Sequence, residues 1–124
     1  GFANEQVVAD LLKWYGSKEK AMEAVMQATG DPGEIKEEQE ENEKIYRRFM
    51  AAKENGDKEL EHSAVEMLAK NYKKMFALDN ARNILLDLAK EYLQNGKLSE
   101  ATDIQFGKGC SAYVAQAIQG YYGV

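Results

Sequence analysis

The side chains able to perform acid–base, nucleophilic or metal chemistry are few in this sequence. It contains one His, His62, and one Cys, Cys110. A nucleophilic Ser or Cys needs a neighbouring base, usually a His, and His62 lies among charged residues that predict an exposed helical surface. Cys110 falls on an apolar helical stripe, so we expect a buried, unreactive thiol. A single Cys also excludes an internal disulfide and a zinc site built of cysteines.

The spacing of these residues does not support a metal, haem or nucleotide site either. Glu59 and His62 form one Glu-x-x-His, but a di-iron bundle needs two such motifs. His62 would also have to be the proximal ligand of any haem. Gly107-Lys108-Gly109 lacks the spacing of the nucleotide-binding glycine motifs. The spacing of the Asp and Glu residues does not place any one carboxylate in an apolar pocket, as the raised pKa of a catalytic acid would require. We therefore expect no catalytic residue, no metal and no cofactor, and do not interpret the chain as an enzyme.

Length and composition indicate one globular domain. Of the 124 residues, 44% are hydrophobic and 30% charged, and the net charge is −5. An acidic chain lacks the clustered Lys and Arg that bind phosphates, so we expect no direct contact with nucleic acid. No apolar run approaches the roughly 20 residues of a membrane span, and no signal peptide is recognised. The expected location is cytoplasmic.

Apolar residues recur at helical spacing along the chain, and no segment alternates with the period of a strand. We predict an all-α fold of about six helices around one core. A turn is expected at residues 31–33, and Asp57 and Asp79 are expected to cap the helices that follow them. The predicted helices cover residues 5–15, 18–29, 34–55, 58–77, 80–94 and 110–121, with a short helical turn around residues 99–104.

One helical segment is unusual because it has no apolar side. Residues 34–43 include six Glu, and no apolar residue occurs between Lys36 and Lys44. Charge runs of this kind are most often solvated helix faces, and Glu at a helix start complements the helix dipole. The alternative is that this half-helix, with nothing apolar to bury, projects into solvent, connects two parts, or becomes ordered only when something binds.

Aromatic residues are the remaining feature that could serve a function. The chain has one Trp, seven Tyr and four Phe. Clefts for small ligands are lined by apolar and aromatic side chains with few polar anchors, although packing in the core is the simpler explanation for each single ring. Trp14 and Tyr15, on an amphipathic segment ahead of the Glu-rich run, are candidates for a lid over such a cleft. The candidate ligand-binding residues are Trp14, Tyr46, Phe49, Tyr72, Phe76, Tyr92, Phe106 and Tyr113.

Several short segments, spread along nearly the whole chain, resemble the motifs of a known family and occur in the same order as those motifs. They are Lys13-Trp14-Tyr15-Gly16-Ser17, Ile45-Tyr46-Arg47-Arg48-Phe49-Met50 with Asn55-Gly56, Glu91-Tyr92-Leu93 with Gly96-Lys97-Leu98, Gly107-Lys108-Gly109, and Ala112-Tyr113 with Ala117-Ile118. This set resembles the TipAS antibiotic-recognition domain, found at the C-terminus of certain MerR-type transcriptional activators.

The resemblance implies a globin-like all-α fold that binds bulky, largely apolar antibiotics such as thiopeptides in a deep cleft. Residues 34–124 would form the recognition core. Residues 1–33 would form a mobile helical lid that becomes ordered when the antibiotic binds. In a complete regulator, which we expect to be a homodimer, this ordering would be relayed to DNA through a separate N-terminal domain absent from this chain.

The chain also departs from the family pattern. Members that capture thiopeptides covalently have a Cys on the fifth helix, where this chain has none and Asn80 falls near the position. The family's His on the fourth helix is replaced by Ala69 or Lys70, and Leu98 and Gly109 stand where a Phe and a Pro are expected. We therefore expect binding without covalent capture. The alternative functions are a stand-alone protein that sequesters a drug, and a helical module that binds a peptide helix or a second copy of itself.

Overall fold

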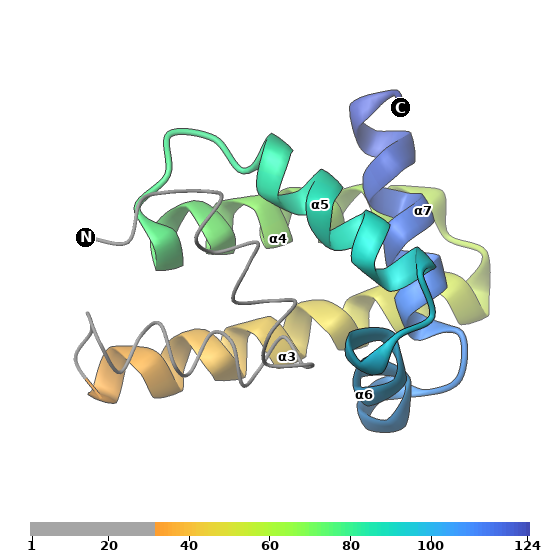
Figure 1. Ribbon diagram of the computed structural model, residues 1–124, viewed down its shortest axis with the longest axis horizontal. Helices are drawn as coiled ribbons and strands as arrows, with labels where there is room; N and C mark the ends of the chain where they lie inside the picture. Colours follow the sequence, from red (N-terminus) through yellow and green to blue (C-terminus); the bar gives the residue numbers. More distant parts are fainter. Residues whose placement is uncertain (1–31) are drawn as a thin grey trace.

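The computed structural model describes residues 32–124, which form five α-helices and no strand (Figure 1). The all-α prediction is confirmed for this part of the chain. Nearly all of the predicted lid, with the helices expected over residues 5–15 and 18–29, lies outside the described residues. The globin-like arrangement and the total of about six helices stay predictions. The five helices are α3 (Pro32–Asn55), α4 (Lys58–Phe76), α5 (Arg82–Leu93), α6 (Lys97–Phe106) and α7 (Cys110–Tyr122).

α3 and α4 run in opposite directions and are joined by a short turn (Figure 1). Gly56 ends α3 with a φ of 63°, in the left-handed region that glycine adopts without a steric penalty. The Asp57 carboxylate then accepts a hydrogen bond of 3.0 Å from the backbone N–H of Leu60 and caps α4. The predicted turn after Asn55 and the predicted cap at Asp57 are both confirmed.

The start of α3 differs from the prediction. Pro32 and Gly33 were expected in a turn, but α3 begins at Pro32. The first position of a helix suits Pro, because the backbone N–H that Pro lacks has no partner inside the helix there. Pro32 thus begins the helix instead of only preventing the previous one from continuing.

The core lies where α5, α6 and α7 pack against α4 and the second half of α3 (Figure 1). Most of the buried residues fall on the predicted apolar stripes, and among the described side chains of α3 those of the core begin at Ile45. The buried core residues are Ile45, Tyr46, Phe49, Ala64, Val65, Leu68, Tyr72, Phe76, Ala81, Ile84, Leu85, Leu88, Ala89, Tyr92, Leu98, Cys110, Val114, Ala115, Ala117 and Ile118.

The link between α4 and α5 corrects one predicted cap. α4 ends after Phe76 at Ala77, which has a left-handed φ of 52° and donates its N–H to the carbonyl of Lys73. Asp79 does not cap α5. The N-cap of α5 is Ala81, and the side chain of Asn80 accepts a hydrogen bond of 3.2 Å from the N–H of Arg82. Asn and Asp side chains accept such a hydrogen bond equally well, and Asp79 was chosen although the neighbouring Asn80 accepts it.

Two glycines form the corner between α6 and α7. Gly107 has a φ of 125° and Gly109 a φ of 86°, values that other residues adopt only with strain. The Asp103 carboxylate accepts a hydrogen bond of 2.8 Å from the N–H of Ser111 across this corner. The helix expected as a short turn around residues 99–104 is longer, covering Lys97–Phe106. Within residues 32–124, none of the helices has the length and apolar character needed to cross a membrane.

Candidate ligand-binding site

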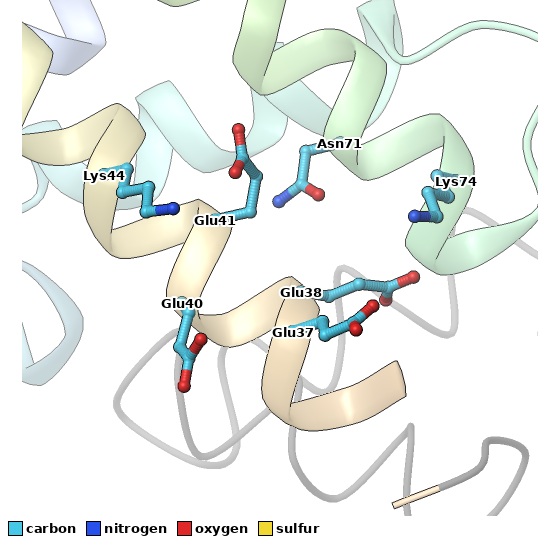
Figure 2. A pocket seen from close by; sticks show the side chains of 7 residues that line it. All are labelled: Glu37, Glu38, Glu40, Glu41, Lys44, Asn71 and Lys74. Atoms are coloured by element: carbon cyan, nitrogen blue, oxygen red, sulfur yellow. The ribbon is translucent and has the colours of Figure 1, made fainter. Parts of the chain in front are cut away.

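A groove opens between the first half of α3 and the second half of α4 (Figure 2). Its volume is about 320 Å³, near the lower end of the range of about 300–1,000 Å³ typical of ligand sites. Figure 2 shows Glu38 extending from α3 toward α4, and Asn71 and Lys74 extending from α4 toward α3. The described residues that line this α3–α4 groove are all polar: Glu37, Glu38, Glu40, Glu41 and Lys44 from α3, and Asn71 and Lys74 from α4.

A second hollow, of about 240 Å³, continues the groove along α4. It shares Glu41, Asn71 and Lys74 with the first hollow and adds Met67 and Lys70. Met67 gives this end of the groove an apolar surface. The α3–α4 groove as a whole therefore offers a ligand carboxylates, amines, one amide and one thioether.

The helical repeat explains why polar side chains line this groove. Glu38 and Asn42 extend the inward stripe that Ile45 and Phe49 occupy on α3, at spacings of four, three and four residues. Both are buried, with 8% of Glu38 and 1% of Asn42 exposed. The expectation that this half-helix simply projects into solvent is therefore wrong for its inner face. It buries a polar face next to α4 instead of an apolar one.

Four of the predicted ligand-binding rings meet inside the core. Tyr46 and Phe106 are stacked with ring centroids 5.0 Å apart, and Tyr46 meets Phe49 edge-on at 5.9 Å. The hydroxyls of Tyr46 and Tyr92 lie 2.7 Å apart and share a hydrogen bond. Tyr46, Phe49 and Tyr92 are fully buried, and Phe106 is partly buried against the core. Burial, followed by the proximity of Tyr92, raises the pKa of Tyr46 well above its ordinary value.

The other predicted rings lie elsewhere. Tyr72 and Phe76 pack edge-on on α4, with ring centroids 5.5 Å apart, and are buried. Tyr113 on α7 is partly buried, and burial together with a hydrogen bond to the Glu61 carboxylate raises its pKa. Trp14 lies outside the described residues. None of the seven described rings lines the α3–α4 groove, and their part in ligand binding stays a prediction.

The side chains that do line the groove were missed by the aromatic criterion. A signal for two of them was present in the sequence. Asn71 lies three residues after Leu68 on the stripe of α4, and Glu38 lies seven residues before Ile45 on the stripe of α3. Polar residues on an otherwise apolar stripe indicate a place where the packed core ends and a polar contact begins.

The two residues considered for chemistry lie as expected. His62 is exposed, its Nε2 lies 3.0 Å from Glu66 Oε1, and its ring centroid is 4.7 Å from that of Tyr121. The Cys110 thiol is fully buried. Among residues 32–124, no group of three or more His, Cys, Asp or Glu side chains is placed to hold a metal ion.

The described residues thus form a helical domain with a polar groove beside a closed aromatic core. In the comparison with known families, residues 9–121 match the family described as the TipAS antibiotic-recognition domain. Since the match covers most of the chain, the protein belongs to this family of antibiotic-recognition domains. No curated protein and no solved structure matches the chain.

Proposed function

We propose that this chain is the effector domain of a MerR-type transcriptional regulator and that it binds a bulky, amphiphilic antibiotic in the α3–α4 groove. The observation that carries the proposal is the position of this groove, in a member of an antibiotic-recognition family. It lies between the first half of α3 and α4, and none of the fully buried core side chains among the described residues lines it. A ligand can enter there without displacing those core side chains.

Residues 1–33 are proposed to act as the lid of this groove. The described walls offer little apolar surface beyond Met67, whereas Trp14 and Tyr15 in the predicted lid are large aromatic side chains. A lid that closes over a bound antibiotic would supply the apolar contacts that the walls lack. Ordering of the lid would then be coupled to burial of the antibiotic's surface.

Binding is proposed to be reversible. Covalent capture of a dehydroalanine group needs an accessible thiolate, because the thiolate is the nucleophile. The one Cys of the chain, Cys110, is fully buried on α7. It does not line the α3–α4 groove. The bound antibiotic is thus held by contacts alone, and dissociates unchanged.

Titration of the chain with thiopeptides and other macrocyclic antibiotics tests the proposal. Trp14 is the only Trp, so its emission reports on the predicted lid. We expect a saturable change in this emission and slower hydrogen exchange in residues 1–33 when an antibiotic binds. Mass spectrometry under denaturing conditions should return the unmodified mass of the chain. The absence of both the emission change and the protection with every compound would overturn the proposal.

The genetic context of the chain separates the regulator from a stand-alone sequestering protein. In a regulator, a basic helix-turn-helix domain is encoded ahead of Gly1, and it makes the contacts with DNA that this acidic chain does not provide. We expect such a domain, and we expect the complete regulator to sediment as a homodimer. A gene that encodes no DNA-binding domain would favour sequestration.

A further inference from the structure

The chain contains two Asn-Gly pairs, and each lies where a helix ends. Asn55-Gly56 follows the last turn of α3, and Asn95-Gly96 lies between α5 and α6 (Figure 1). In such a pair the backbone nitrogen of Gly can attack the side-chain amide of Asn, because Gly has no Cβ to obstruct the approach. The reacting groups belong to neighbouring residues, so the reaction is intramolecular and needs no enzyme. Each pair is therefore a candidate for spontaneous chemical modification.

α3 protects the first of these pairs. Asn55 is the last residue of α3, and its side-chain Nδ2 donates a hydrogen bond of 3.0 Å to the carbonyl of Ala51. The N–H of Asp57 donates a hydrogen bond of 3.0 Å to the carbonyl of Ala52 and fixes the turn that follows. Attack on Asn55 by the nitrogen of Gly56 would require the backbone of Asn55 to leave the helix and its side chain to give up the bond to Ala51.

Fewer contacts hold the second pair. Asn95 and Gly96 are both exposed, and Asn95 has a left-handed φ of 56°. Among residues 32–124, neither the side chain of Asn95 nor the N–H of Gly96 makes a hydrogen bond. Rotation about the Cα–C bond of Asn95 can therefore bring its Cγ atom against the Gly96 nitrogen without the loss of a hydrogen bond by either group.

The fold does not require a glycine at position 96. Gly96 has a φ of −93° and a ψ of −160°, an extended conformation that other residues also adopt. A Cβ atom there would have no heavy atom from another part of the described chain within 4 Å. Gly56, in contrast, has a φ of 63°, at which a side chain is strained. Gly96→Ala thus obstructs attack on Asn95 without straining the backbone.

We infer that Asn95 is a site of spontaneous deamidation and that α3 protects Asn55 from the same reaction. The Gly96 nitrogen attacks Cγ of Asn95. The N–Cγ bond forms, the Cγ–Nδ2 bond breaks, and ammonia leaves with the proton of the Gly96 N–H. Water then opens the succinimide, giving isoaspartate when it adds at the carbonyl next to Cα and aspartate when it adds at Cγ. This site goes beyond the proposed function and does not depend on it.

The isoaspartate product changes the chain just before α6. In isoaspartate the main chain runs through the side-chain carbon, so the link gains one CH₂ group ahead of Gly96. The Gly96 carbonyl accepts the hydrogen bonds that begin α6, from the Glu100 N–H at 3.0 Å and the Ser99 hydroxyl at 2.9 Å. The aspartate product keeps the backbone and places a negative charge before the N-terminus of α6, where the helix dipole favours it. We therefore expect isoaspartate, and not aspartate, to destabilise the fold.

Ageing of the full chain in mildly alkaline buffer tests the inference, because succinimide formation is faster when the amide loses its proton more easily. Peptide mapping by mass spectrometry, with an isoaspartyl methyltransferase assay, locates and counts the products. We expect isoaspartate to accumulate at residue 95, with residue 55 almost unmodified, and Gly96→Ala to remove most of the product. In denaturant α3 no longer protects Asn55, so the two Asn-Gly pairs should react at comparable rates.

Three results would overturn the inference: no accumulation of isoaspartate at residue 95, modification of Asn55 as fast as that of Asn95 in the folded chain, or an unchanged rate in Gly96→Ala. If Gly96→Ala does not fold by circular dichroism, Asn95→Gln blocks the same reaction, since its longer side chain would have to close a larger ring.

Asn95→Asp is the matched control for stability, because it carries the charge of the product on an unchanged backbone. Its urea midpoint should equal or exceed that of the wild type, whereas the isoaspartate form, separated by chromatography, should unfold at a lower urea concentration. An isoaspartate form as stable as the fresh chain would overturn the effect assigned to α6.

Discussion

The hydroxyl oxygens of Tyr46 and Tyr92 lie 2.7 Å apart in the centre of the core, and this hydrogen bond joins α3 to α5. Both side chains are fully buried. The hydroxyl of Thr102 from α6 lies 3.4 Å from the Tyr92 oxygen, and also donates a hydrogen bond of 2.9 Å to the carbonyl of Leu98. Three helices thus meet at a small polar cluster in an otherwise apolar core, where an unpaired hydroxyl would be costly.

Loss of either tyrosine hydroxyl should destabilise the fold. We expect Tyr46→Phe and Tyr92→Phe each to lower the free energy of unfolding by about 1–2 kcal/mol, because each leaves a buried hydroxyl with a weaker partner. The double variant should lose less stability than the sum of the two single losses, because neither tyrosine hydroxyl of the pair then remains buried without its partner. Urea unfolding followed by circular dichroism measures all three values.

Tyr121→Phe serves as the control for this cycle. Tyr121 is half-buried at the surface, and its described contacts are to the rings of His62 and Tyr122. Its substitution should change stability by less than about 0.5 kcal/mol. Strictly additive effects of the two core substitutions would contradict an energetic coupling between Tyr46 and Tyr92.

Stability should fall at alkaline pH through the same cluster. The pKa of Tyr46 is raised in the folded state by burial and then by Tyr92, so as the pH rises the unfolded chain, with a tyrosine pKa of about 10, loses the proton first. The stability contributed by neutral Tyr46 is therefore fully present below pH about 10 and is lost as the pH rises beyond it. The difference in urea midpoint between the wild type and Tyr46→Phe should stay constant up to pH about 9 and narrow as the pH rises above about 10. A constant difference would contradict the prediction.

Ala77 offers a stabilising substitution. This residue ends α4 with a left-handed φ of 52° and is exposed, a conformation in which Cβ is strained and Gly is not. We expect Ala77→Gly to raise the free energy of unfolding by about 0.5–1 kcal/mol. Ala51→Gly, inside α3, should lower it by a similar amount, because Gly is unfavourable within a helix. The two urea midpoints should move in opposite directions, and a shift in the same direction would refute the assignment of strain to Ala77.

The Cys110 thiol should be protected in the native protein. Because the residue is fully buried in α7, we expect neither a thiol reagent nor a dehydroalanine-containing thiopeptide to modify the folded chain. Addition of denaturant should make the thiol react at a rate that follows the unfolded fraction. Mass spectrometry counts the modified molecules, and rapid labelling without denaturant would show that the thiol is accessible.

The core was predictable because its signals are local. Apolar stripes at three- and four-residue spacing located Tyr46, Phe49 and Leu88 on buried faces, and Asp57 was recognised as a cap from its place before an apolar run. The start of α5 was predicted wrongly, because Asp79 has a side chain typical of a cap, whereas the N-cap is Ala81 and the side chain that accepts from the Arg82 N–H is that of Asn80.

The candidate site was harder to predict, because a polar groove has the composition of an ordinary surface. Glu38 and Glu41 were part of a charge run, and nothing in the run itself indicates that Glu38 lies against α4. Glu38 lines the same groove as Asn71 and Lys74 of α4, residues more than thirty positions away in the sequence. Core packing was the simpler explanation for each ring, but core rings and cleft rings occupy the same helical stripes, so the sequence could not separate them.

Because α3 continues without interruption from Pro32 to Asn55, one helix belongs both to the wall of the groove and to the core. If the core unfolds, α3 no longer holds Glu38 and Glu41 in the wall of the groove. Ligand binding and folding are therefore coupled. A ligand that binds only the folded protein adds about 2.7 kcal/mol to the free energy of unfolding when its concentration is one hundred times its dissociation constant. Thermal denaturation curves recorded across a compound library would thus rank the antibiotics by affinity.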